Sequence, residues 1–380
     1  MQCVRAGLLS LLLVTLAAAQ NQFVYTNNQT QPNTITGFLV NSDGSLTQIA
    51  GSPFATGGNG QNGFWQTLAV TTFPGKNYLY AANGEDGTIS AFRIDPATGN
   101  LSHTPGSPFV TNNQPANYSL TITPDNRFLF VASDGSPLIH VFAISPKTGS
   151  LREVPGGPFE LNSSFDGLKV SANGQFLFAG VNGEQEVAAF QISQSGFLSA
   201  VPGSPFAASG FVSALTTNCA GNFVFAASGG VDVYSLSANG SLTPVPGSPF
   251  PNGSNSTSVD LRSIDLVLSP SNQFLFVSES SLLNGSGAVS GFEVSVHGRL
   301  SPVKGSPFPV TDVNSGIAIT SKGDFLYTVL FISNELDGRR VGADGTLTPV
   351  PGTPFATGEH SVTGLAESVV AFPAPSCSQP

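Results

Sequence analysis

The sequence contains little charge and little sulfur. Only 9% of its 380 residues are Asp, Glu, Lys or Arg, and three residues are Cys. Acidic residues outnumber basic ones by 23 to 13, which gives a formal net charge of −10. A chain this acidic and this poor in Lys and Arg repels phosphate groups, so we expect no nucleic-acid partner. The low cysteine content also excludes a small scaffold held together by disulfides.

Motifs for bound metals are also missing. The sequence has no His-x-x-x-His or Cys-x-x-Cys pair of the kind that binds zinc or haem. It has no contiguous Asp-x-Asp-x-Asp loop for Ca²⁺ either. We therefore predict no metal site and no cofactor.

A strongly apolar run stands at the N-terminus, and no later segment is long enough to span a membrane. Arg5 precedes a mostly apolar stretch from Gly7 to Ala19 that ends in three alanines. Its thirteen residues are too few to cross a bilayer, which takes about 20, and small residues at its end suit a signal peptidase. We expect residues 1–19 to be a cleaved signal peptide, and the protein to be secreted or periplasmic without binding to a membrane.

Gly, Pro and Phe are abundant, and together they mark a repeat. The sequence Gly-Ser-Pro-Phe or a close variant occurs seven times, at intervals of 55, 50, 47, 44, 58 and 47 residues. The copies begin at Gly51, Gly106, Gly156, Gly203, Gly247, Gly305 and Gly352. A period of about fifty residues without helical periodicity is typical of the blades of a β-propeller.

Each repeat contains four strand signals in a fixed order. An apolar strand, such as Ile264 to Leu268, comes first in most repeats, and an aromatic–aliphatic–aromatic triplet forms the second strand. The seven triplets begin at Phe23, Tyr78, Phe128, Phe176, Phe223, Phe274 and Phe325. A third strand carries one ring, and a Gly-x-Leu step opens the fourth. The last repeat has Arg339 in place of that ring, so we predict that this strand is displaced or that its edge opens to solvent.

The two ends of the chain predict how the ring closes. The chain begins with a second strand, Phe23 to Tyr25, and ends with an unaccompanied first strand around Gly364 to Phe372. If both join one blade, the ring closes without a covalent link and leaves only short, protected edges. We predict an all-β fold, a seven-bladed β-propeller with four-stranded blades over residues 20–373. A tail at residues 374–380 follows, and we expect a monomer.

The Pro-Phe pair that closes each repeat has an expected structural role. Pro ends the outer strand, because it cannot donate to the ladder of hydrogen bonds. The Phe ring should then pack, mostly dry, between neighbouring blades. Seven such rings predict a repeated contact that holds the blades together.

These motifs resemble those of a known family. The Phe-Val-Tyr-Thr-Asn start at Phe23, the turn–aromatic-strand units and the closing Gly-Ser-Pro-Phe are similar to the lactonase seven-bladed β-propeller family. That family contains 6-phosphogluconolactonase-like proteins and is related to repeat propellers named for a Tyr-Val-Thr-Asn motif. The likeness covers residues 21–373. It implies the propeller fold and, in the enzymes of the family, His and Arg side chains that open a lactone at the channel mouth.

Only one of the expected mouth loops carries a histidine. Six of the seven loops that lead into first strands lack His, and the seventh contains Glu359 and His360. Opening a lactone needs a base to activate water and a cation or N–H donor for the developing oxyanion. We name His360 as candidate base, Glu359 or Asp166 as its orienting carboxylate, and Arg262 as the anion stabiliser. The alternative is that all four are solvated loop residues.

Two cysteines remain after removal of the signal peptide. Cys219 follows the first strand of its repeat and Cys377 follows the closing first strand, so both should emerge on one face. In an oxidising compartment they either pair, which would pin the tail across the channel, or remain two separate thiols.

Two functions remain open at this point. The first, slightly favoured by the missing mouth histidines and the low charge, is a scaffold that binds an unknown small molecule or protein at the channel face. The second is a lactone hydrolase that acts on a sugar or other small lactone. The family resemblance and the pair of His360 and Arg262 support the second.

Overall fold

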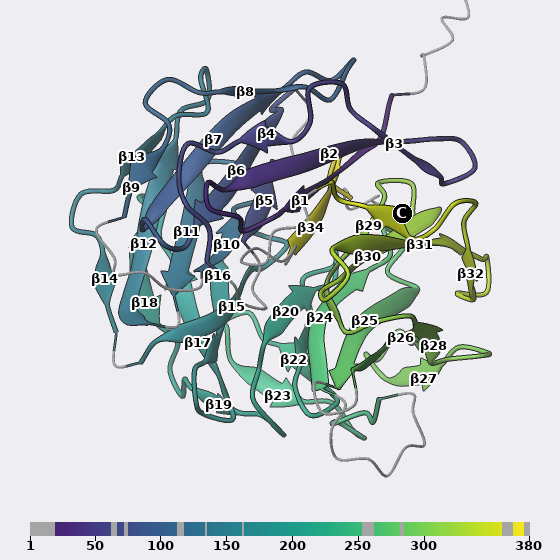
Figure 1. Cartoon of the computed structure of the whole chain (residues 1–380). Helices are drawn as coiled ribbons and strands as arrows, with labels where there is room; N and C mark the ends of the chain where they lie inside the picture. The colour runs from purple at the N-terminus through teal and green to yellow at the C-terminus, as the bar shows by residue number, and fades with distance from the viewer. Residues whose placement is uncertain are drawn as a thin grey trace, which may run out of the picture.

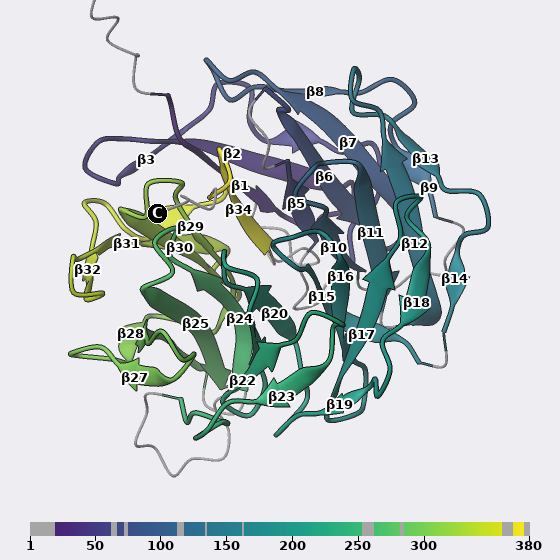
Figure 2. The ribbon, with the colours of Figure 1, turned by 180° about the vertical axis from the view of Figure 1, so that it is seen from behind.

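Every regular element of the described chain is a β-strand. The computed structural model describes residues 20–61, 67–71, 75–111, 118–133, 135–161, 163–252, 262–281, 285–358 and 368–375. Within these ranges, 34 strands form seven antiparallel sheets. Figure 1 and, from behind, Figure 2 show these sheets arranged around one axis. The predicted seven-bladed β-propeller is confirmed.

The strands follow the same order in every blade. The inner strands are β5 (Leu68–Val70), β10 (Tyr118–Ile122), β15 (Phe165–Val170), β20 (Ala214–Thr217), β24 (Arg262–Leu268), β29 (Asn314–Ile319) and β34 (Ser368–Phe372). The second strands, which begin with the aromatic triplets, are β1 (Phe23–Asn27), β6 (Tyr78–Asn83), β11 (Phe128–Ser133), β16 (Phe176–Val181), β21 (Phe223–Ala227), β25 (Phe274–Ser281) and β30 (Phe325–Leu330). The third strands are β2 (Thr34–Val40), β7 (Thr88–Ile94), β12 (Ser136–Ile144), β17 (Glu186–Ile192), β22 (Val231–Leu236), β26 (Ser286–Val294) and β31 (Glu335–Val341). The fourth are β3 (Leu46–Gln48), β8 (Leu101–His103), β13 (Leu151–Glu153), β18 (Leu198–Ala200), β23 (Leu242–Pro244), β27 (Leu300–Pro302) and β32 (Leu347–Pro349).

The outer edge of most blades consists of two short strands, whereas the prediction gave each blade a single fourth strand there. In six blades the Phe of Gly-Ser-Pro-Phe opens a fifth short strand: β4 (Phe54–Ala55), β9 (Phe109–Val110), β14 (Phe159–Glu160), β19 (Phe206–Ala207), β28 (Phe308–Val310) and β33 (Phe355–Ala356). The fourth and fifth strands pair with opposite ends of the same third strand, as β3 and β4 do with β2. In the remaining blade, Phe250 makes a single bridge to Val231.

The Gly-Ser-Pro step between these two outer strands has a clear chemical role. Its glycines have φ between 78° and 98°, a left-handed conformation that glycine adopts without strain. The hydroxyl of the next residue accepts the third-strand N–H that faces the gap, from Gly37 to Ser52 at 2.8 Å and from Gly338 to Thr353 at 2.7 Å. The same bond recurs at Ser107, Ser204, Ser248 and Ser306. The repeat therefore satisfies a backbone donor that the interrupted outer strand leaves open.

The hydrophobic core consists of seven clusters, and each lies between two neighbouring blades. Every cluster includes the Phe ring of one Gly-Ser-Pro-Phe segment. The predicted packing of these rings between blades is confirmed. The expectation of mostly dry rings is met at Phe250, which is 7% exposed, whereas the other six are only half-buried.

Phe250→Ala is expected to lower the free energy of unfolding by about 3–5 kcal/mol, because it leaves a cavity between two blades. Phe54→Ala removes a half-buried ring and should cost less. Denaturant unfolding of both variants measures the difference. A loss below ~1 kcal/mol for Phe250→Ala would contradict the packing account.

The glycine of the Gly-x-Leu step is also explained by the contact between blades. It has a positive φ in all seven repeats and lies against the first aromatic ring of the preceding blade. A Cβ atom would lie 2.5 Å from the Phe176 ring at Gly240 and 2.5 Å from the Phe274 ring at Gly345. Only glycine lets the blades approach this closely.

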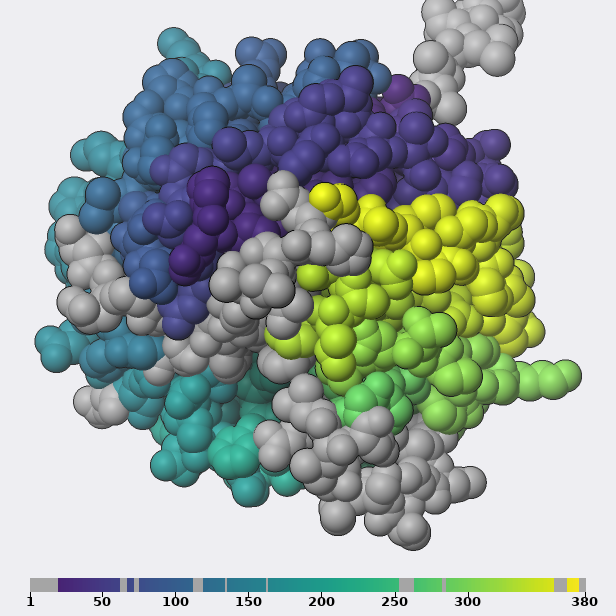
Figure 3. Space-filling view, in the orientation of Figure 1, coloured from purple at the N-terminus to yellow at the C-terminus, as the bar shows by residue number. Residues whose placement is uncertain are grey.

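The ring closes as the chain ends predict. Strand β34 pairs antiparallel with β1, from Phe23 opposite Phe372 to Asn27 opposite Ser368. Figure 3 shows the yellow C-terminal part of the chain against the purple N-terminal part on the molecular surface. The clusters on both sides of this shared blade join it to its two neighbours.

The prediction for Arg339 is wrong. Strand β31 is neither displaced nor open, and it pairs in regular register with β30 and β32. The Arg339 side chain is only 12% exposed, and its Nε donates to Asp337 Oδ2 at 2.5 Å. An Nη2 donor also reaches the carbonyl of Pro309 at 2.9 Å. The guanidinium replaces a ring because a neighbouring carboxylate and a carbonyl satisfy it.

Candidate functional site: the central channel

The inner strands of all seven blades surround a cavity on the propeller axis. Its volume is about 540 Å³, and Ala374 and Pro375 contribute to its lining beside the seven strands. One ring of lining positions pairs with the second aromatic residue of each triplet: Ala69, Thr121, Lys169, Thr216, Val267, Ala318 and Val370. Six of these seven side chains are small or aliphatic, and Lys169 is the exception.

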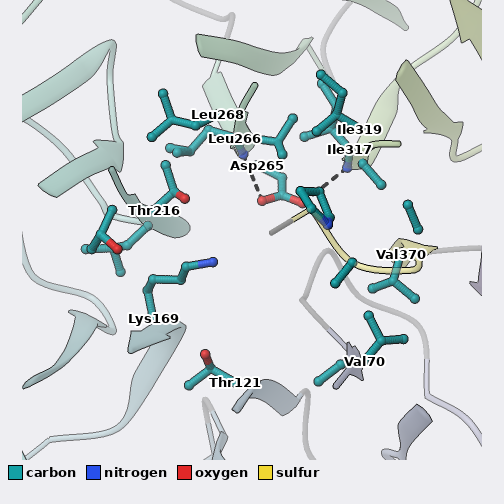
Figure 4. A pocket seen from close by; sticks show the side chains of 18 of the residues that line it. Val70, Thr121, Lys169, Thr216, Asp265, Leu266, Leu268, Ile317, Ile319 and Val370 are labelled. Carbon is teal, nitrogen blue, oxygen red and sulfur yellow. Dashed lines mark hydrogen bonds between the residues drawn. The ribbon is translucent and has the colours of Figure 1, made fainter. Parts of the chain in front are cut away.

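Lys169 lies in β15, and its ammonium group points into the cavity (Figure 4). The three ion pairs found within the described residues involve other groups. Burial lowers the pKa of Lys169, and the negative charge of Asp265 opposes that shift. Burial therefore disfavours the ammonium form of Lys169, and an anionic or carbonyl ligand would stabilise that form.

Asp265 reaches the cavity from β24, two blades further round the ring. It follows a β-bulge at Ser263/Asp265, and such bulges commonly re-aim a side chain next to a functional site. Its Oδ1 accepts the N–H of Leu266 at 2.8 Å, and its Oδ2 accepts the N–H of Ile317 at 3.2 Å. Ile317 itself follows a bulge in β29. Two backbone donors therefore hold the carboxylate in a fixed orientation.

Lys169 and Asp265 are the only charged side chains in the described lining of the cavity. Figure 4 shows both projecting toward its centre from different strands. An ammonium and a carboxylate at one cavity supply an electrostatic donor and a proton acceptor, the two groups that hydrolysis of an ester requires. The charge of Asp265 inside the predicted apolar strand, Ile264 to Leu268, and the charge of Lys169 on another inner strand were the signals missed from the sequence.

Of the four residues predicted from the sequence, only Asp166 lies wholly within the described part of the chain. Asp166 lies in a bulge of β15, is 8% exposed, and accepts a hydrogen bond from Asn182 Nδ2 at 2.7 Å. It is absent from the described cavity lining. Arg262 begins β24, and its side chain lies outside the described part of the chain, as do Glu359 and His360 entirely.

Cys219 is disulfide-bonded. Its predicted partner, Cys377, lies outside the described residues. Cys219 lines the channel cavity together with Ala374 and Pro375, so the segment just before Cys377 passes this end of the channel. That placement agrees with a tail that crosses the axis.

Glu279 is a second buried acid, located in β25 away from the cavity lining. It is 0% exposed, and burial raises its pKa to about 7 although Ser290 lowers it in part. The corresponding residues in the first two blades are Asn28 and Asn83, whose amides donate to hydroxyls of the third strand at 2.8 Å. Glu279 is thus an acid at a position where these two blades have asparagine.

Glu279 makes the stability depend on pH. Because its pKa is higher in the folded than in the unfolded chain, its protonated form favours folding below about pH 4.5, and that contribution is lost as the pH rises through about 7. We expect the free energy of unfolding to fall by about 3 kcal/mol over this range. Urea unfolding of wild type and Glu279→Gln measures it, with exposed Glu293→Gln as control. An unchanged pH slope in Glu279→Gln would refute this assignment.

Within the described residues, no group of three or more His, Cys, Asp or Glu side chains is placed to hold a metal ion. The described chain also contains no helix of the length and apolarity that a membrane crossing requires.

Comparison with known proteins relates part of the chain to a family. Residues 15–162 match the family model described as "Lactonase, 7-bladed beta-propeller", and the observed fold extends that architecture around the full ring. The predicted resemblance to the lactonase seven-bladed propeller family is confirmed. No curated protein matches it in sequence.

Solved structures share the fold of this propeller at low sequence identity. A putative 6-phosphogluconolactonase from Bacteroides fragilis is 18% identical with a TM-score of 0.73, and the match covers 93% of this chain and 99% of that one. The periplasmic gluconolactonase PpgL of Pseudomonas aeruginosa is 20% identical with a TM-score of 0.67, covering 88% and 97%.

Proposed function

We propose that the protein is a lactone hydrolase whose reaction takes place in the central channel between Lys169 and Asp265. The observation that carries the proposal is one ammonium and one carboxylate facing an otherwise uncharged cavity of about 540 Å³. The match to the lactonase family model over residues 15–162 supports a hydrolase over the binding scaffold that the missing mouth histidines had favoured. In the channel, Lys169 and Asp265 could supply the chemistry without a histidine.

Asp265 acts as the general base. Each carboxylate oxygen has two lone-pair sites, and one site on each is taken by the backbone N–H of Leu266 or Ile317. In the proposed reaction the carboxylate also accepts a hydrogen bond from the attacking water molecule. As the water oxygen attacks the lactone carbonyl carbon, Asp265 takes its proton.

Lys169 stabilises the oxyanion that this attack creates. Its ammonium donates to the former carbonyl oxygen, in a poorly solvated site where a charge-assisted hydrogen bond is strong. The tetrahedral intermediate then collapses by breaking the bond from the carbonyl carbon to the ring oxygen. The proton on Asp265 passes to that oxygen, and the new carboxyl group releases the second proton of the water to solvent. The product is an open-chain hydroxy acid whose carboxylate lies beside Lys169.

The mouth residues form a competing assignment within the same function. His360 as base, Glu359 or Asp166 as its orienting group and Arg262 as anion stabiliser would place the reaction at the entrance of the channel. The buried Asn182–Asp166 contact gives Asp166 a structural partner already. We therefore favour the channel pair.

Proton release at constant pH from simple γ- and δ-lactones and from glucono-δ-lactone tests the proposal. The purified protein should hydrolyse at least one of them faster than buffer does, and Asp265→Asn should lose more activity than His360→Ala. Rates equal to buffer on every lactone would overturn the function. A collapse confined to His360→Ala would move the base to the mouth loop.

A further inference from the structure

The channel has two chemically different sides. Going round the ring of lining positions, the polar side chains Thr121, Lys169 and Thr216 come from three consecutive blades, and Asp265 comes from the next. The facing blades contribute only aliphatic side chains at the same level: Ala318, Val370 and Ala69. Figure 4 shows Lys169, Thr121 and Thr216 on one side and Ile319, Val370 and Val70 on the other.

Several polar groups of the lining already have partners. The N–H groups of Leu266 and Ile317 bind Asp265, and the N–H of Val170 lies 3.4 Å from Thr121 Oγ1. Towards the Cys219 end, Ser269 Oγ accepts the N–H of Phe274 at 3.0 Å, and Asn272 Oδ1 accepts the N–H of Cys219 at 2.9 Å. The lining therefore offers few hydrogen-bonding groups to a ligand that carries many hydroxyls. Burying a hydroxyl without a hydrogen-bond partner is unfavourable.

The charge of the lining also selects against a phosphorylated ligand. The described lining contains one cation, Lys169, and one anion, Asp265. A phosphate group carries nearly two negative charges near neutral pH. It would share a single ammonium with the lactone carbonyl and would face the Asp265 carboxylate, which repels it.

We infer that the preferred substrate is a lactone whose ring bears an alkyl substituent, rather than a sugar lactone or its phosphate ester. This inference rests on the proposed function. The ring carbonyl lies on the Lys169 side, and the alkyl chain lies against Val70, Ile319 and Val370. The product is a hydroxyalkanoate with its carboxylate at Lys169 and its chain on the aliphatic side.

A series of δ-lactones with linear alkyl substituents of increasing length tests the inference, with glucono-δ-lactone and 6-phosphoglucono-δ-lactone as comparisons. We expect kcat/KM to rise about fourfold for each methylene that is buried, which corresponds to about 0.8 kcal/mol. The rise should stop once the chain fills the cavity. Both sugar lactones should be poorer substrates than the longest alkyl lactone.

Two conservative variants locate the chain-binding side. Val370→Thr replaces a methyl group with a hydroxyl of similar size, and Ala318→Ser adds a hydroxyl to a smaller side chain. In both variants the increase in kcat/KM per methylene should fall to about twofold. Val296 is 86% exposed on an outer turn, so Val296→Thr is the matched control and should leave the gain unchanged. Using two sites guards against one variant that fails to fold.

The outcomes separate the inference from the proposed function. Faster turnover of either sugar lactone, or kcat/KM independent of chain length, overturns the alkyl preference and leaves lactone hydrolysis intact. If no lactone is hydrolysed, calorimetric titration with linear 5-hydroxyalkanoates decides. Affinity that rises with chain length and falls in Val370→Thr then supports the two-sided channel, and affinity independent of length overturns it.

Discussion

Asp265→Asn is expected to lower kcat for lactone hydrolysis by about 10²–10⁴-fold, the usual contribution of a positioned general base. The amide keeps the size of the side chain and one acceptor oxygen, but it takes no proton from water. The fold should survive, because the change removes only one of the two hydrogen bonds that the N–H groups of Leu266 and Ile317 donate to this side chain. Initial rates on one uncharged lactone measure the loss, with circular dichroism as the check on folding.

The matched control is Asp312→Asn. Asp312 also accepts two backbone N–H groups, from Val313 at 2.6 Å and Ser333 at 2.7 Å, but it does not line the described cavity. It therefore reproduces the structural role without the proposed chemistry. If both variants lost the same activity, Asp265 would be a structural residue and not the base.

Lys169→Met should lower kcat by about 10²–10³-fold, as removal of an oxyanion donor does in other hydrolases. Methionine preserves the length and the contacts of the aliphatic stem. Lys169→Arg should restore part of the activity, because it keeps a positive charge near the carbonyl oxygen. Steady-state kinetics should show the loss in kcat rather than in KM.

The pH profile distinguishes this role from a structural one. Only the protonated Lys169 stabilises the oxyanion, and burial lowers its pKa from the ordinary 10.5. As the pH is raised, activity should therefore be lost with a midpoint below pH 10.5. The charge of Asp265 raises the pKa of Lys169. In Asp265→Asn the midpoint of this loss should therefore lie at a lower pH than in the wild type. Lys169→Arg should lack the decline altogether, because arginine stays charged. An identical alkaline limb in Lys169→Arg would show that another group titrates.

The fold was readable from the sequence because each repeat encodes its own contacts. The aromatic triplet, the Gly-x-Leu step and Gly-Ser-Pro-Phe each make one contact that recurs in nearly every blade, so the same residues return at the same spacing. Ring closure followed from which strand each chain end supplies. The position of Arg339 was misjudged because its partner, Asp337, lies two residues away on the same strand, a pairing that the missing ring alone does not reveal.

The channel pair was not readable in this way. Lys169 and Asp265 stand 96 positions apart on two different blades, and nothing in the spacing of the repeats brings particular side chains together across the axis. Asp265 was included in a predicted apolar strand, Ile264 to Leu268, because its neighbours are aliphatic. The relevant signal was a charge on an inner strand, most clearly at Lys169, where the other blades carry Ala, Thr or Val. Loop residues such as His360 attracted attention instead, because mouth loops are where propeller enzymes usually vary.

The most direct test of the channel site is the rate of proton release from one alkyl δ-lactone, measured side by side for the wild type and the double variant Lys169→Met/Asp265→Asn. The account predicts saturable hydrolysis by the wild type and a rate at the buffer background for the double variant, with both proteins equally folded. A folded double variant that hydrolyses the lactone as fast as the wild type would contradict it, and so would a wild type that never exceeds the buffer rate.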